Sequence, residues 1–162
     1  MLNFFAPMQL IQKVLPGMRA RRSGMIVNIS SIGTVRGALE LASEALAKET
    51  EHLGIRVMLV EPGAFRTRFY GEDLQESAIR ISDYDILASR YRKAFIRHDQ
   101  PGDPQRGAEI IVENALRKDT PMRLVLGSDA LRSARQVLQA RLLELERMEQ
   151  ESRKSGKEDR MD

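Results

Sequence analysis

The chain has 162 residues, of which 26 are Lys or Arg and 23 are Asp or Glu, and it contains no cysteine. This length suits one domain, and the lack of cysteine excludes disulfides and thiolate metal sites. The two charge signs are interspersed, so a net charge of +3 predicts no basic stripe for nucleic acid. No segment reaches the ~18 apolar residues of a membrane span. We therefore expect a cytoplasmic protein with no membrane or nucleic-acid partner, and with only His52 and His98 we expect no metal site.

The first part of the chain alternates predicted helices and strands. Apolar side chains recur at helical spacing over residues 4–20, and the run MIVNIS (residues 25–30) is rich in β-branched residues. Residues 38–53 have strong helix propensity, and Gly54 follows where a helix commonly stops. The run IRVMLVEPG (residues 55–63) is apolar without alternation. Such a run predicts a strand that is buried on both faces, as in a parallel sheet.

The middle of the chain is less regular. Residues 64–100 show no clear period and predict helical pieces and loops. Asp103 then predicts a helix N-cap, with Pro104 in the first helical turn. The run MRLVLGS (residues 122–128) predicts a third short strand. This order of elements predicts an α/β fold, a partial Rossmann-like (doubly wound) layer of about three parallel strands with flanking helices and right-handed crossovers.

A helical C-terminus follows from Asp129 onward. Its apolar residues recur at helical spacing, and we interpret them as a packing face rather than a ligand site: Val137, Leu138, Leu142, Leu145 and Met148. The last stretch is almost wholly polar and has too little apolar surface to offset its ordering entropy. We therefore expect a folded domain over residues 1–148 and a disordered polar tail over residues 149–162.

Polar residues follow the first two predicted strands at their carboxyl ends. Ser30 and Ser31 follow the first strand, and PGAFRT (residues 62–67) follows the second. Ligands of open α/β sheets bind outside the carboxyl ends of the strands, and adjacent strands would bring the two clusters together. Each cluster alone also fits an ordinary turn or cap. Their joint order and spacing favour a binding site.

Three segments together resemble the short-chain dehydrogenase/reductase family. RRSGMIVNISSIG resembles the family's fifth strand and serine segment, and SEALAKETEHLGIRVMLVEPGAFRTRF resembles the next helix, the sixth strand and the PG turn. LNFFAPM resembles the start of the fourth helix. The match covers most of residues 2–150. The resemblance implies hydride transfer between a small-molecule carbonyl or alcohol and NADP or NAD.

The resemblance also implies roles for five residues. Ser31 would hydrogen-bond the substrate oxygen, and Asn3 would help to hold a water in the proton relay. Pro62, Gly63 and Thr67 would contact the nicotinamide half of the cofactor. All five residues occupy positions that match the family's motifs.

The sequence departs from the family pattern in two respects. TVRG runs directly into ALELASEAL, so the acid/base tyrosine and the lysine of the family's YxxxK motif are missing, and no tyrosine has a lysine four residues later. The 162 residues also contain no TGxxxGxG or NNAG segment for the dinucleotide phosphates. We therefore expect a truncated form of the family that has no appreciable dehydrogenase activity alone.

Two functions stay open at this point. The first is an NAD(P)-dependent oxidoreductase of the family, present here in truncated form. The second is a non-catalytic binding or dimerisation module, a homodimer or heterodimer formed through residues 4–20 and 38–53, because helices at these positions often build the family's dimer interface.

Overall fold

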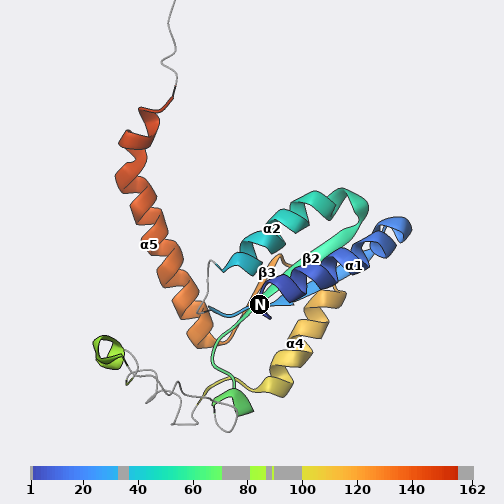
Figure 1. Ribbon diagram of the computed structural model, residues 1–162, viewed down its shortest axis with the longest axis horizontal. Helices are drawn as coiled ribbons and strands as arrows, with labels where there is room; N and C mark the ends of the chain where they lie inside the picture. Colours follow the sequence, from blue (N-terminus) through green and yellow to red (C-terminus); the bar gives the residue numbers. More distant parts are fainter. Residues whose placement is uncertain (1, 33–36, 71–80, 87–88, 90–99, 157–162) are drawn as a thin grey trace, which may run out of the picture.

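A computed structural model describes residues 2–32, 37–70, 81–86, 89 and 100–156 of the chain (Figure 1). Helices and strands alternate along it as the sequence predicts. Their bounds are α1 (Phe5–Arg21), β1 (Gly24–Ile29), α2 (Ala38–Thr50), β2 (Ile55–Pro62), α4 (Pro104–Leu116), β3 (Arg123–Leu126) and α5 (Ser128–Arg153), with short 3-10 turns at Glu51–Leu53, Arg68–Tyr70 and Ser82–Tyr84. The two latter turns fall in the irregular segment, most of which lies outside the described residues.

The three strands form one parallel sheet in the order β1-β2-β3. Ile26 lies opposite Val57 across the first pair, and Leu59 lies opposite Arg123 across the second. Residues Val57 to Glu61 of the central strand are all buried, because helices cover both faces of the sheet. The predicted α/β fold with three parallel strands is confirmed, as is the prediction that the second strand is buried on both faces.

Two apolar clusters lie on opposite faces of β2. On one face, Ile11 of α1 and Leu46 of α2 pack with Ile26, Ile55 and Val57 of the strands. On the other face, Met58, Val60 and Leu126 pack with Ile110, Ile111 and Ala115 of α4. Alternate residues of β2 thus belong to different clusters, since side chains alternate along a strand. The carboxyl ends of the strands stay open between these layers.

Local chemistry explains where the helices start and stop. The side chain of Asp103 accepts hydrogen bonds from the backbone N–H of Gln105 at 2.9 Å and of Arg106 at 3.4 Å, so it caps α4 as predicted. Gly54 ends the 3-10 turn after α2 with φ of 70°. A Cβ at this position would overlap the carbonyl oxygen of Arg22, so the turn requires glycine for two reasons.

Helix α5 runs away from the sheet and is the longest helix described (Figure 1). Only Ala130 and Ala134, in its first two turns, are buried. The helix continues to Arg153, so its last turn includes residues of the predicted tail, where Arg153 pairs with Glu149 at 2.6 Å. Such pairs one turn apart stabilise a polar helix end. Residues 157–162 lie outside the described part, and the division at residue 148 stays a prediction.

Candidate functional site

The carboxyl end of β1 places the two serines. The parallel ladder extends one residue past the strand, because the N–H of Ser30 donates to the carbonyl of Val60 at 2.8 Å. The Ser30 hydroxyl donates to Oε1 of Glu40, a fully buried carboxylate in the first turn of α2, at 2.8 Å. Ser30 therefore joins the strand end to α2 and to a buried carboxylate. Ser31 comes next in the chain and is exposed.

The turn after β2 is held by backbone hydrogen bonds on both sides. The N–H of Gly63 donates to the carbonyl of Leu126 in β3 at 2.8 Å. On the other side, the Gly102 N–H donates a hydrogen bond to the Ala64 carbonyl at 3.0 Å, and the Arg66 N–H donates one to the Gly102 carbonyl at 3.0 Å. This short bridge ties the turn to the start of α4. The turn is thus fixed before any ligand binds.

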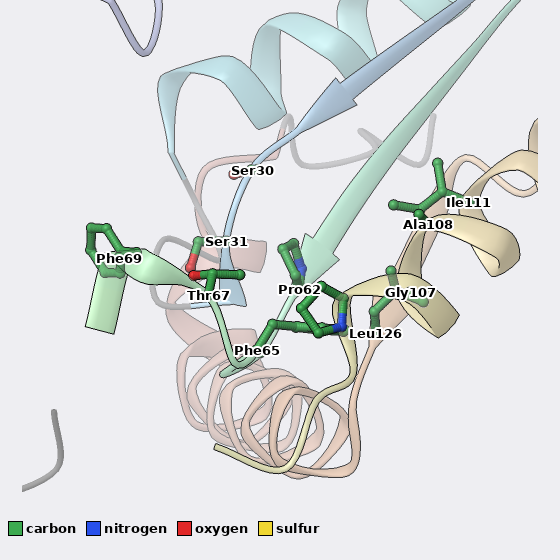
Figure 2. Close-up of a pocket in the computed structure, with 12 residues that line it drawn as sticks. Ser30, Ser31, Pro62, Phe65, Thr67, Phe69, Gly107, Ala108, Ile111 and Leu126 are labelled. Carbon is green, nitrogen blue, oxygen red and sulfur yellow. The ribbon is translucent and has the colours of Figure 1, made fainter. Parts of the chain in front are cut away.

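A cavity of about 430 Å³ lies between these two strand ends and the start of α4. Figure 2 shows Ser31 and Thr67 on one side of the cavity, Pro62 and Phe65 near its centre, and Gly107, Ala108 and Ile111 of α4 on the other side. Its volume falls in the range of small-molecule sites, about 300–1,000 Å³. Its wall is formed by Ser30, Ser31, Pro62, Gly63, Phe65, Thr67, Phe69, Pro104, Gly107, Ala108, Ile111 and Leu126.

A second cavity of about 510 Å³ lies on the other side of the serines. Asn3 lines it, together with Ser30 and Ser31 and the first turn of α2. The two cavities therefore share the serine pair. The structure brings Ser31, Pro62, Gly63 and Thr67 around one cavity, and it brings Asn3 and Ser31 around the other.

Asp129 is a positioning residue that the sequence analysis did not single out. It lies in the first turn of α5, and its Oδ2 accepts a hydrogen bond from the Ala64 N–H at 2.7 Å. A Cβ at Gly63 would overlap both carboxylate oxygens, so the absence of a side chain at Gly63 lets the carboxylate approach the turn. Oδ1 is buried and accepts no hydrogen bond from the residues that the structure describes. The Gly-Ser-Asp-Ala sequence after β3 was the only available signal.

The ring of Phe65 lines the first cavity and packs against two glycines. Two glycines of the facing segment approach the ring so closely that a Cβ at Gly102 would lie 2.6 Å from Cγ, and a Cβ at Gly107 would lie 2.7 Å from Cε1. Side chains at these positions would push the ring into the cavity. The two glycines therefore allow the ring to take its place in the cavity wall, which the sequence pattern alone did not indicate.

Three carboxylates gather around one guanidinium beneath the serine segment. Arg123 of β3 pairs with Glu61 of β2 and with Glu44 of α2, the latter at 2.7 Å, and it lies 3.6 Å from Oε2 of Glu40. Burial raises the pKa of Glu61, whereas the charge and hydrogen bond of Arg123 act in the opposite direction. Glu40 also accepts the hydrogen bond from Ser30, so the cluster connects Arg123 of β3 and Glu61 of β2 to the end of β1.

The arrangement suits a small ligand that has a polar group next to an apolar part. Hydroxyl groups of Ser31 and Thr67 offer donors and acceptors, while Phe65, Phe69, Ile111 and Leu126 offer apolar contact. None of the described residues that line the two cavities is a tyrosine or a lysine. Among the described residues, no group of three or more His, Asp or Glu is placed to hold a metal ion. No helix in the described part is long and apolar enough to cross a bilayer.

A parallel sheet with helices on both faces and polar residues at its carboxyl edge defines a Rossmann-like class of α/β protein. Residues 1–78 match the family model for short chain dehydrogenase. A crystal structure of a short-chain dehydrogenase from Streptomyces avermitilis superposes with a TM-score of 0.84 at 36% identity, covering 96% of this chain and 61% of that one. The chain belongs to the short-chain dehydrogenase/reductase family.

Curated relatives carry oxidoreductase names. A 3-ketodihydrosphingosine reductase from Bacteroides thetaiotaomicron is 35% identical over an aligned length of 139 residues, and the alignment covers 77% of this chain and 52% of the relative. Oxidoreductase claN from Passalora fulva is 47% identical over an aligned length of 79 residues, and the alignment covers 41% of this chain and 36% of the relative. The chain thus spans about half the length of these curated relatives, or less.

Proposed function

We propose that the cavity between the serine segment and the PG turn is the nicotinamide and substrate side of a carbonyl or alcohol oxidoreductase site. The supporting observation is that Ser31, Pro62, Gly63 and Thr67 line one cavity whose backbone is fixed by β3 and Asp129. Membership of an oxidoreductase family is the second support. In this proposal Ser31 donates a hydrogen bond to the substrate oxygen and thereby orients the carbonyl.

The residues present fit the nicotinamide half of NAD or NADP. The side chains of Phe65 and Pro62 make the wall apolar, which suits a nicotinamide ring, and the Thr67 hydroxyl offers a partner for a carboxamide. A bound NADH or NADPH supplies a hydride. Within this chain, Pro62 and Gly63 hold the ring against the strand ends, Ser31 holds the substrate oxygen, and Asn3 holds a water beside the serines.

The substrate in this proposal is a small carbonyl or alcohol with hydrocarbon beside the reacting carbon. Apolar side chains from three segments, Phe65, Ile111 and Leu126, border the hydroxyls of the cavity. Hydrocarbon next to the carbonyl would bury against them. One relative is named for a keto substrate, 3-ketodihydrosphingosine, and this name supports the class without fixing the compound.

Alone, the 162-residue chain is proposed to bind NADPH weakly and to show no appreciable turnover. The sequence contains no YxxxK pair, and general acid/base catalysis of the kind that pair provides is worth about 10²–10⁴ in rate. No glycine-rich turn for the phosphates occurs in these residues either, and without that turn most of the cofactor's affinity is missing.

A pair of titrations tests the proposed site. We expect NADPH fluorescence to show no saturation at micromolar concentrations, whereas reduced nicotinamide mononucleotide at millimolar concentration shifts the amide resonances of Gly63 and Thr67. Ala108→Trp, which fills the cavity from α4, should abolish these shifts, and Ala140→Trp on the exposed part of α5 should leave them unchanged. Micromolar NADPH binding would refute the proposed weak binding of the cofactor. Amide shifts confined to other residues would refute the proposed position of the nicotinamide site.

A non-catalytic dimerisation module is the second candidate. Helices α1 and α2 leave apolar side chains exposed, with Phe5 at 58%, Leu10 at 65% and Leu41 at 58% exposure. Such faces favour a homodimer or heterodimer through residues 4–20 and 38–53. Leu10→Lys should then weaken self-association of the chain in analytical ultracentrifugation, and self-association of unchanged affinity would contradict the proposed surface.

A cytoplasmic location is proposed on the cysteine-free composition, which fits a reducing compartment. Fractionation of cells that express a tagged chain tests it. Recovery of the chain in the cytosolic fraction is the expected result, and recovery with membranes would contradict it.

A further inference from the structure

Helix α5 carries an apolar stripe that the proposed site does not use. We define the α5 stripe as Leu131, Leu138, Leu142, Leu145 and Met148, whose exposed fractions are 44%, 62%, 57%, 60% and 50%. Leu131, Leu138 and Leu145 recur every seven residues, the spacing of a two-stranded coiled coil. The stripe runs for about 26 Å along the helix at 1.5 Å per residue. A leucine face of this length that is not covered by the described part of its own domain indicates an interaction surface.

The charges on α5 are divided between its two halves. The first half, to Arg141, has three arginines against one aspartate, and the second half has four glutamates against two arginines. This division is the reverse of the one that the helix macrodipole favours, so the dipole does not explain it. The residues concerned are Asp129, Arg132, Arg135 and Arg141 in the first half, and Glu144, Glu146, Arg147, Glu149, Glu151 and Arg153 in the second.

Several of these charges have no ion-pair partner among the residues that the structure describes. Arg132, Arg135 and Arg141 make no ion pair with any residue that the structure describes, and the same holds for Glu144 and Glu146. A partner helix that is acidic beside the first half and basic beside the second half would pair with all of them. The sequence of α5 itself, in the opposite direction, has this pattern.

We propose that α5 is an interaction surface for a second copy of this chain, with the two α5 helices packed antiparallel along the α5 stripe. In this arrangement the arginines of one first half lie beside the glutamates of the other second half, with Leu142 near the centre. Parallel packing would set arginine beside arginine and glutamate beside glutamate, which is unfavourable. This contact is separate from the dimer surface on α1 and α2, and it goes beyond the proposed function.

The full chain in analytical ultracentrifugation tests the surface. The wild-type chain should sediment as a dimer at tens of micromolar, and Leu138→Lys should raise the dimer Kd by at least roughly tenfold, because it places a charge in the apolar seam of both copies. Leu116→Lys on α4 is the matched control, since Leu116 is 78% exposed and lies off α5. A monomeric wild type, or a dimer that Leu138→Lys leaves unchanged, overturns the proposal. Loss of the dimer in Leu10→Lys with retention in Leu138→Lys assigns the contact to α1 instead and also overturns it.

Cross-linking tests the direction of the two helices. The chain has no cysteine, so single substitutions give single reactive sites. Arg135→Cys and Glu149→Cys lie about 21 Å apart along one helix, on either side of Leu142. With a short bismaleimide, a mixture of the two variants should yield covalent dimers, while each variant alone should yield none. Covalent dimers from each variant alone would show parallel packing and overturn the antiparallel arrangement, as would a dimer that cross-links in none of the three samples.

Discussion

Removing the carboxylate of Asp129 is the sharpest test of how the PG turn is held. In Asp129→Ala, the Ala64 N–H loses its acceptor at 2.7 Å, and α5 loses a negative charge in its first turn. A hydrogen bond to a charged group contributes about 1.5–3 kcal/mol, and a charge near a helix N-terminus contributes about 0.3–1 kcal/mol. The substitution also removes Oδ1, a buried oxygen that has no hydrogen bond within the described residues, and its removal offsets part of this loss. We expect the free energy of unfolding to fall by about 2 kcal/mol.

Urea denaturation followed by circular dichroism measures this change. Asp129→Asn keeps an acceptor oxygen and should lose less stability than Asp129→Ala. Asp119→Ala is the surface control, because Asp119 is 74% exposed and pairs only with Arg117 in the described part of the chain. Nuclear magnetic resonance should show that the amide of Ala64 moves most in Asp129→Ala. If Asp129→Ala unfolds at the same urea concentration as the wild type, the carboxylate does not hold the turn.

Three further predictions follow from the same structure. Burial raises the pKa of Glu61 above 4.5, so the native state binds the carboxyl proton more tightly than the unfolded state does. The free energy of unfolding should therefore fall as pH rises through the window just above 4.5. Glu61→Gln should remove this slope in urea titrations at several pH values. Gly107→Ala should lower the free energy of unfolding by roughly 1–2 kcal/mol, because the new methyl group meets the Phe65 ring. Gly17→Ala in α1 meets only the flexible end of an arginine and should raise the free energy of unfolding by up to ~1 kcal/mol. Changes of the same sign in both variants would contradict the packing argument. Asp103→Ala should cost about 1 kcal/mol through the lost cap, and no change in the thermal midpoint would count against it.

Periodic patterns and strong local signals made the fold predictable. The unbroken apolar run of residues 55–63 indicated a doubly buried strand, and the structure buries Val57 to Glu61. Asp103 and Gly54 have cap and stop functions that depend on their own side chain or its absence, so local sequence was sufficient. Helix α5 extends beyond the predicted boundary because its polar end is held by pairs one turn apart, which composition alone does not reveal.

The site was predictable in part. Topology alone brought the residues after β1 and β2 together, since the carboxyl ends of adjacent parallel strands meet. The contribution of Asp129 was not predictable, because its contact with Ala64 spans 65 residues and depends on how α5 leaves β3. The cluster of the buried Glu40 and Glu61 with the half-buried Arg123 was missed for the same reason. A glutamate on a strand or helix gives no sign in the sequence that it faces the interior.

Intermolecular nuclear Overhauser effects between the chain and reduced nicotinamide mononucleotide test the central claim most directly. Our account predicts effects from the nicotinamide ring protons to Pro62 and to the Thr67 methyl group, on the wall that Figure 2 shows. The cavity at the opposite end of the strands, beside Lys48 and Met122, has a similar volume of about 490 Å³ and serves as the internal comparison. Ring contacts at Lys48 and Met122, with none at Pro62 and Thr67 under saturating ligand, would contradict the account.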